Sequence, residues 1–305
     1  MAKYILKRIL ISILTIFVLV TITFFLVRKL PGDPFSSEKM QPQIKENLIA
    51  YYGMDKPLLQ QYFTYLNNLL HGDLGYSLVY RGRTVNAILG ESFAYSADMG
   101  IRALLFSTIV GLLLGIIAAL RHAKAADYAC MIVAVIGVSV PSFIAGYVLQ
   151  YIFAIKLEWL PPAQWETLSS TIMPVLALGL GNLALVARLM RANMLDVVGM
   201  DYIKTAKAKG LSPFQVTTRH QIRNAILPVV TVMGPAVANL LTGTFVIEKI
   251  FSIPGMGRHY VSSIQNYDYT TVLGLTVFFG TFLVVMNLIV DILYGIIDPR
   301  IRVSK

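Results

Sequence analysis

Cysteine and charged residues are scarce in this chain. One cysteine, Cys130, stands among 305 residues, so the chain cannot form an internal disulfide or a cysteine metal cluster. Charged residues make up 14% of the sequence and hydrophobic residues 56%, whereas soluble domains carry about 25% charged residues. This imbalance predicts a membrane protein in which Cys130 is a small buried hydrophobic residue.

Motifs for nucleotide binding and catalysis are also lacking. The sequence has no GxxxxGKS or GxxxxGKT phosphate-binding loop, no HExxH and no GxSxG, so neither an ATP-binding site nor an intramembrane enzyme is expected. The four histidines, His71, His122, His220 and His259, are scattered without metal-ligand spacing. We expect no catalytic residue, metal site or cofactor in this chain, so any ATP that drives it must bind to another chain.

The net charge of +10 raises the question of a nucleic-acid partner. Lys and Arg are not gathered on one aromatic-rich surface segment, as binding to nucleic acid would need. They flank the apolar segments instead, as membrane topology requires. We therefore expect membrane lipid as a partner and no nucleic acid.

Six apolar runs are each long enough to cross a hydrocarbon layer about 30 Å thick. The first, Ile9–Val27, is followed by LPGDP rather than by the small residues of a cleavage site, so we interpret residues 1–30 as an uncleaved signal anchor and not a secretory signal. The others are 103–120, 128–152, 168–187, 227–247 and 270–297. The predicted fold is an all-α polytopic membrane protein with about six transmembrane helices and both termini on one side.

The distribution of positive charge predicts the orientation. Most of the 26 Lys and Arg lie on the side of the termini, whereas the shorter loops opposite hold only Lys156, Lys249 and Arg258. Both termini are therefore expected in the cytoplasm. Residues 31–98 then form an extracytoplasmic segment, in which QQYFTYLNNLLHG indicates an amphipathic helix at the membrane mouth. Residues 99–305 form the core, with a cytoplasmic loop at 192–228.

A few residues in the spans are unusual for a membrane helix. Asp291 is expected near the cytoplasmic interface, and Arg188 and Arg191 fit topology and the helix dipole rather than a substrate role. Helix-breaking residues fit either hinges or close helix packing, and the sequence favours neither: Pro141, Pro174, Gly179, Gly181, Pro228, Gly234 and Pro235.

The stretch YIKTAKAKGLSPFQVTTRHQIRNAILP, residues 202–228, interrupts the apolar pattern. Each of its five Lys and Arg would cost about 2.5–3.5 kcal/mol at a bilayer centre, so the stretch must lie in water. Gly210 is a candidate left-handed helix cap, and Ser212-Pro213-Phe214-Gln215 has the order of a capping box. A helix–Gly–helix hairpin is predicted.

Phe214 and Val216 are the expected exposed apolar residues of this hairpin. From charge alone the stretch is an ordinary basic cytosolic loop. The capping order, the length and the apolar tip together favour an element that docks in a partner's groove.

Several motifs resemble one family over nearly the whole chain. TAKAKG, LSPF and AILP resemble the EAA loop of membrane-spanning subunits of ABC importers, in the form of the dipeptide, oligopeptide and nickel permease branch. LPGDP (30–34), GMDKPLLQQY (53–62), HGDLGYS (71–77), EKIFSIPGMG (248–257) and DPRIR (298–302) look like that branch in order and spacing. Where the wider family has Glu-Ala-Ala, this chain has Lys204-Thr205-Ala206.

The resemblance implies a translocation-pathway subunit of an ATP-driven importer in the prokaryotic inner membrane. Its partners would be a second homologous permease, two ABC ATPase subunits that bind ATP and Mg²⁺, and an extracytoplasmic substrate-binding protein. The residues implied in coupling to the ATPase are Thr205, Ala206, Gly210, Leu211, Ser212, Pro213 and Phe214.

EKIFSIPGMG follows the fifth span on the outer side. An outer gate or a contact for the binding protein is one interpretation, and a simple outer turn is the other. The residues concerned are Glu248, Phe251, Pro254, Gly255 and Gly257.

The cargo stays open at this point. The resemblance implies dipeptides or oligopeptides, with nickel or a metal chelate as the alternative. A stand-alone secondary transporter would need paired charges at mid-membrane or inverted repeats, and the sequence shows neither.

Overall fold

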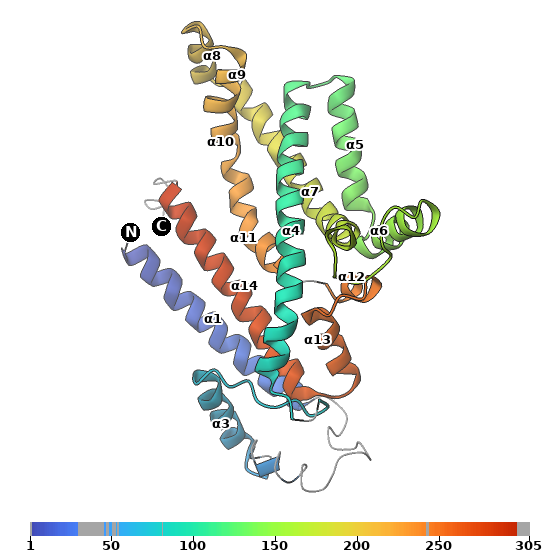
Figure 1. The fold of residues 1–305 in the computed structure, drawn as a ribbon. Coiled ribbons are helices and arrows are strands. Elements are labelled where there is room, and N and C mark those ends of the chain that lie inside the picture. Colours follow the sequence, from blue (N-terminus) through green and yellow to red (C-terminus); the bar gives the residue numbers. More distant parts are fainter. Residues whose placement is uncertain are drawn as a thin grey trace.

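The structure is a computed structural model that describes residues 2–29, 46, 49–50, 53, 55–80, 82–241 and 244–297. The motifs LPGDP (30–34) and DPRIR (298–302) lie outside the described residues. The described part forms helices and no named strand, with one isolated antiparallel bridge between Tyr76 and Thr84. Figure 1 shows an elongated bundle with α3 at one end and α8 and α9 at the other.

Five helical segments are long and apolar enough to cross a membrane, and a bent pair makes a sixth if it is one span. The helices are α1 (Ala2–Arg28), α3 (Leu58–Leu70), α4 (Val85–Leu120), α5 (Ala125–Ser139), α6 (Ser142–Leu149), the π-helix η1 (Gln150–Lys156), α7 (Leu168–Val198), α8 (Asp201–Ala208), α9 (Pro213–Val216), the π-helix η2 (Thr217–Ile222), α10 (Arg223–Ala225), α11 (Leu227–Leu241), α12 (Phe245–Ile250), α13 (Met256–Gln265) and α14 (Tyr269–Ile297). The predicted all-α polytopic fold is confirmed.

The third predicted span, 128–152, is not one straight helix. The chain bends by 106° between α5 and α6. Pro141 stands at this bend, and Val140 before it is extended, with φ −92° and ψ 116°. Proline disfavours the helical conformation in the preceding residue and cannot donate a backbone hydrogen bond, so it ends α5.

The second span begins much earlier than the predicted residue 103. Thr84 caps α4 by accepting a hydrogen bond from the Ala87 amide at 3.2 Å, and the helix then runs without a break to Leu120. The predicted boundary at residue 98 between the outer segment and the core therefore lies inside a helix.

Helices α4 and α7 pack backbone to backbone at the centre of the bundle. A Cβ atom on Gly115 of α4 would lie 2.6 Å from the carbonyl oxygen of Ala187 on α7, so only glycine permits this approach. Small residues at such contacts are the usual means of bringing membrane helices together. At Gly115, the missing side chain therefore serves close helix packing.

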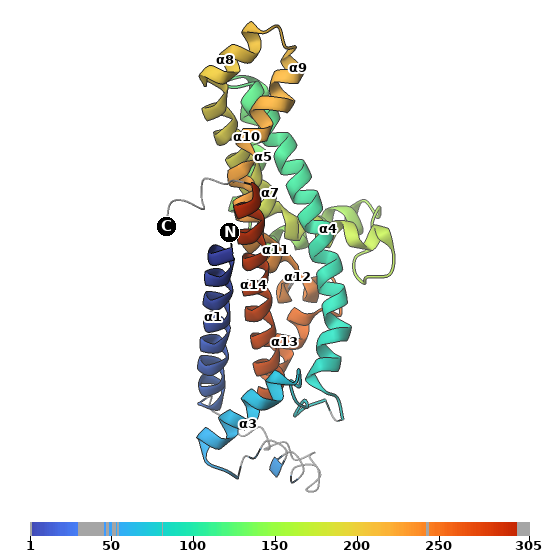
Figure 2. The ribbon, with the colours of Figure 1, turned by 90° about the vertical axis from the view of Figure 1, so that its left-hand side faces the viewer.

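Helices α1 and α14 lie side by side (Figures 1 and 2). Arg8 near the start of α1 forms an ion pair with Asp291 near the end of α14 at 2.7 Å. Helix α1 therefore begins, and α14 ends, at the same side of the bundle, the side toward which α8 and α9 point (Figure 1). The charge of Asp291 in the last span is therefore paired with a charge on α1.

The outer segment is fastened to the start of α14. Helix α3 forms where QQYFTYLNN predicted a helix, and the Tyr62 hydroxyl lies 2.6 Å from the Thr21 hydroxyl of α1. The fully buried Asp268 accepts hydrogen bonds from the Ser77 hydroxyl, the Leu78 amide at 3.0 Å and the Thr271 hydroxyl at 2.8 Å. Asp268 thus caps α14 and ties the HGDLGYS motif to it.

We predict that Asp268→Ala lowers the free energy of unfolding by on the order of 3 kcal/mol, because it leaves several donors without their charged acceptor. The measurement is the thermal unfolding midpoint in detergent, together with limited proteolysis of the outer segment. Asp55→Ala is the matched control, since Asp55 is exposed in the same segment. Equal behaviour of the two variants would contradict the fastening role of Asp268.

Candidate functional site

The predicted hairpin at 202–228 forms, and its first helix ends in a Schellman motif. Gly210 has φ +79°, the left-handed conformation that favours glycine. The Gly210 amide donates to the Lys207 carbonyl at 3.0 Å and the Leu211 amide to the Ala206 carbonyl at 3.4 Å. Together these bonds end α8 and reverse the chain.

The second helix of the hairpin begins with the predicted capping box. The Ser212 hydroxyl accepts from the Gln215 amide at 3.3 Å, and the Gln215 side-chain oxygen accepts from the Ser212 amide at 3.0 Å. Pro213 occupies the first turn, where its missing amide hydrogen costs nothing. The turn from Gly210 to Phe214 is therefore closed by its own hydrogen bonds.

The tip of the hairpin presents one large apolar side chain. Phe214 is 76% exposed. The expectation that Val216 is also exposed was wrong, because Val216 is buried with Ile203 and Ala206 in a cluster that includes Met190 and Met194 of α7. Two residues apart on a helix, Phe214 and Val216 face opposite ways.

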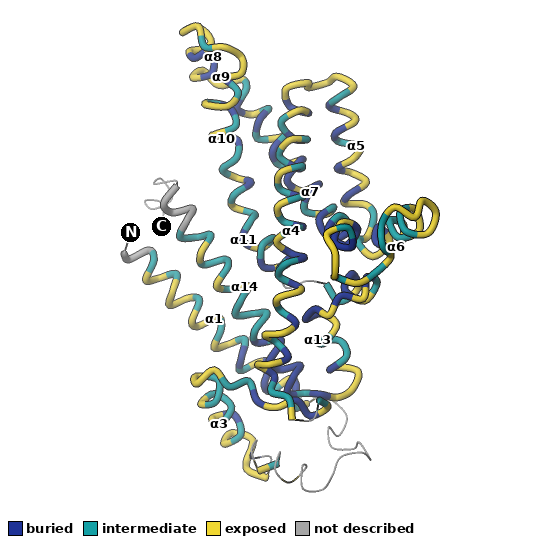
Figure 3. The backbone as a smooth tube through the Cα atoms, viewed as in Figure 1, coloured by how far each residue is buried: buried dark blue, intermediate teal, exposed yellow. Residues whose placement is uncertain are grey.

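The remaining predicted coupling residues surround this tip. Thr205, Ser212 and Pro213 are exposed, Leu211 is half-buried and Ala206 is buried. The hairpin is therefore an exposed tip on a buried base, and that base rests on the end of α7 (Figure 3).

The outer motif EKIFSIPGMG is mostly internal. Glu248 is fully buried, with one carboxylate oxygen 2.8 Å from the donating Ser96 hydroxyl of α4 and the other 3.0 Å from the Arg258 amide of α13. A Cβ on Gly255 would lie 2.5 Å from the Glu248 carboxyl carbon, and one on Gly257 2.6 Å from the Phe245 amide nitrogen. Both glycines are needed for this packing.

Burial within the bundle decides which residues of EKIFSIPGMG another molecule could contact. Phe251 is fully buried, and its carbonyl accepts a hydrogen bond from the Gln164 amide at 2.8 Å. Pro254 is exposed, whereas Gly255 and Gly257 are buried. Glu248 and Phe251 thus do not present their side chains on an outer surface of this chain. The gate itself stays a prediction.

Comparisons with known proteins agree with a membrane bundle of this kind. Residues 111–303 match the family described as binding-protein-dependent transport system inner membrane component, and residues 1–118 match the N-terminal region described for such membrane components. The chain belongs to this family of transport-system membrane components. It is a multi-span membrane protein, as its spanning helices indicate.

Relatives within the family cover the whole chain. The dipeptide transport system permease protein DppB of Bacillus subtilis is 45% identical over 100% of this chain and 99% of its own length. The oligopeptide transport system permease protein OppB of Haemophilus influenzae is 44% identical over 99% of this chain and 100% of its own length.

A solved structure shares the fold at low sequence identity. The MetNI methionine ABC transporter in inward-facing conformations aligns with a TM-score of 0.57 and 14% identity, covering 69% of this chain and 96% of that chain.

The ion pair between Arg191 and Asp127 was not predicted from the sequence. Arg191 donates to both carboxylate oxygens of Asp127, at 2.6 and 2.7 Å, and the Ala123 amide donates to Asp127 at 3.0 Å. The Asp127 side chain is only 3% exposed. The pair ties the α4–α5 turn to α7, close to the hairpin base. The charge of Arg191 was visible in the sequence, but its partner 64 residues away was not.

We predict that Arg191→Ala lowers the free energy of unfolding by on the order of 3 kcal/mol, because it leaves the buried Asp127 carboxylate without its charged partner. Arg188→Ala is the matched control, since Arg188 is exposed on the same helix and should change stability by no more than about 0.5 kcal/mol. Thermal unfolding in detergent measures both. A similar loss in the two variants would show that Asp127 does not depend on Arg191.

Proposed function

We propose that this chain is the translocation-pathway permease subunit of an ATP-driven ABC importer of dipeptides and oligopeptides. The observation that carries the proposal is the full-length identity of 45% and 44% to permease proteins named for dipeptide and oligopeptide transport. The same names favour peptides over nickel or a metal chelate as cargo. The chain itself catalyses no reaction in this proposal.

The hairpin geometry supports coupling to an ATPase subunit. An exposed Phe214 on a rigid turn suits insertion into a partner groove, and aromatic side chains dominate such contacts. The base of the hairpin is buried against α7, so a displacement of the tip is passed to the bundle. Closure of two ATPase subunits around ATP and Mg²⁺ would then bias the bundle between inward- and outward-open states.

The remaining parts of the proposal concern assembly and orientation. A second homologous permease completes the path, and an extracytoplasmic binding protein delivers the peptide. The complex lies in the prokaryotic inner membrane with both termini of this chain in the cytoplasm, as the loop charges favour. A stand-alone secondary transporter is the competing function.

We predict that Phe214→Lys lowers the amount of ATPase subunits that co-purify with the chain by at least ~10-fold, because an aromatic anchor contributes about 2 kcal/mol or more. The chain is co-expressed with its genomic neighbours and purified in mild detergent, and subunit masses and ATP-dependent peptide uptake are measured.

Phe63→Lys is the matched control, since Phe63 is an exposed phenylalanine on α3 at the opposite end of the bundle. It should leave the ATPase subunits bound. A lone chain that transports peptide without ATP would contradict the importer and support the secondary transporter.

A further inference from the structure

The second half of the third predicted span runs across the bundle instead of along it. Helix α5 ends at Ser139, the chain bends by 106°, and α6 with η1 then covers Ser142–Lys156. Figures 1 and 2 show this part projecting from the side of the bundle. Because α5 runs along the bundle, α6 and η1 lie close to the plane of the membrane.

Two observations place this segment at the membrane boundary opposite the hairpin. Helix α5 has 15 residues, so it carries the chain about 22 Å away from the α4–α5 turn, most of the way through a ~30 Å hydrocarbon layer. The Gln150 side-chain amide donates to the Ile250 carbonyl at 3.2 Å, and Ile250 ends the span that begins at Leu227. The segment is therefore level with the far end of that span.

The exposed face of α6 and η1 carries an aromatic row and an aliphatic row, each with a spacing of four residues: Phe143, Tyr147 and Tyr151, and beside them Ile144, Val148 and Ile152. Each of these side chains is at least 40% exposed. Residues spaced by four share one face of a helix, so the two rows form two edges of the exposed surface. The opposite face packs on the bundle, for example at Gly146, where a Cβ would lie 3.3 Å from the Phe251 ring.

The aliphatic row is suited to hydrocarbon. Large aliphatic side chains are unfavourable in water and favourable among acyl chains. Helix α5, which leads into the segment, exposes the same kind of side chain, for example at Ile132, Val135 and Ile136. The aliphatic row therefore continues an apolar surface that already belongs to a spanning helix.

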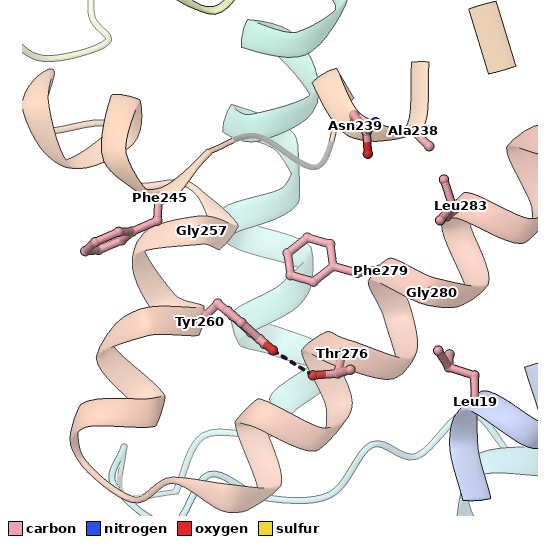
Figure 4. Close-up of a pocket in the computed structure, with 10 residues that line it drawn as sticks. All are labelled: Leu19, Ala238, Asn239, Phe245, Gly257, Tyr260, Thr276, Phe279, Gly280 and Leu283. Carbon is pink, nitrogen blue, oxygen red and sulfur yellow. Dashed lines mark hydrogen bonds between the residues drawn. The ribbon is translucent and has the colours of Figure 1, made fainter. Parts of the chain in front are cut away.

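The tyrosines of the aromatic row need hydrogen-bond partners from outside the chain. Inside the bundle, the Tyr260 hydroxyl lies 3.1 Å from the Thr276 hydroxyl, on the wall of a cavity of about 410 Å³ (Figure 4). The hydroxyls of Tyr147 and Tyr151 form no such bond with any residue that the structure describes. At the membrane–water interface, water and lipid headgroups supply the partner that such a hydroxyl needs.

The bonds of Gln150 show which edge faces the headgroups. Gln150 follows Tyr147 by three residues, so it lies beside the aromatic row. Its side-chain amide donates to the carbonyl of Pro162 at 2.6 Å, in the loop that follows η1. The same loop exposes Trp159 to 70%, and tryptophan is enriched at membrane interfaces. The aromatic row is thus the edge next to the polar loop.

Lys156 adds a positive charge at the same edge. It ends η1 and is exposed, and its Nζ lies 5.6 Å from the centre of the Tyr151 ring. Within the part of the chain that the structure describes, it forms no ion pair. A lysine near the end of a membrane segment extends its charge to the interface, where lipid phosphates carry negative charge.

We infer that α6 and η1 form an in-plane helix that binds the phospholipid interface of the leaflet opposite the hairpin. The aromatic row contacts the headgroups, and the aliphatic row lies among the acyl chains. Because α6 packs on α7 and α12, this contact fixes the depth of both helices in the membrane. It does not depend on the cargo that is transported.

Fluorescence quenching by spin-labelled lipids tests the contact. Cys130 is buried and is replaced first, by Cys130→Ala. Tyr147→Cys and Val148→Cys then place single thiols on the two rows, Ile109→Cys places one on the exposed face of α4, and each thiol is labelled with bimane. The full chain, with all subunits that co-purify with it, is placed in phosphatidylglycerol and phosphatidylcholine liposomes. A nitroxide is carried either near the lipid headgroup or deep in the acyl chain.

Lipid should quench the probes of both rows, and the aromatic-row probe should lie about 5 Å closer to the headgroups, roughly half the diameter of a helix with its side chains. The Ile109→Cys probe reports a deep position, and the Cys130→Ala protein without a new thiol gives the background. Tyr151→Cys and Ile152→Cys repeat the comparison, and they decide it if the first pair does not fold. Row probes that neither lipid quenches would overturn the lipid contact, because another subunit then covers this face. Equal depths of the two rows, or a deeper aromatic row, would overturn the proposed orientation.

Discussion

Hydrocarbon offers a polypeptide no hydrogen-bond partners, and this constraint governs the whole molecule. It forces the spanning segments into helices and leaves each interruption in need of local hydrogen bonds. The bend at Pro141 is closed by the Ala145 amide donating to the Pro141 carbonyl at 3.0 Å. The start of α12 is capped by Thr244, whose hydroxyl accepts from the Ile247 amide at 3.4 Å.

Buried carboxylates fasten the bundle at its helix ends. Asp127 lies in the first turn of α5 and is paired with α7, Glu248 accepts from the first turn of α13 and from α4, and Asp268 caps α14 and is bonded to the outer segment. Each joins elements far apart in sequence. A negative charge at a helix start is also favoured by the helix dipole. These contacts restrict how the helices can shift, so any switching motion must move them as packed groups.

The hairpin and α11 give that motion a direct route. The tip is stiffened by its own caps, its base is buried against α7, and its second helix continues into α11. A displacement at Phe214 therefore reaches α11 without crossing a flexible linker. The coupling part proposed for this chain and a membrane-spanning helix are thus two ends of one helical path.

The sequence by itself determined the class of the protein, the approximate places of the spans and the hairpin, because hydropathy, capping residues and glycine conformation are local properties. Gly210, Ser212 and Gln215 lie within six residues of one another, so their bonds were readable in advance. Only the tertiary structure decided that Val216 is buried, that Arg191 pairs with Asp127 and that Glu248 is internal. Those outcomes depend on which helix faces which across 26, 64 or 152 residues, for instance between Met190 and Val216, Asp127 and Arg191, or Ser96 and Glu248. No local pattern encodes such pairings, because they follow from the packing of the whole bundle.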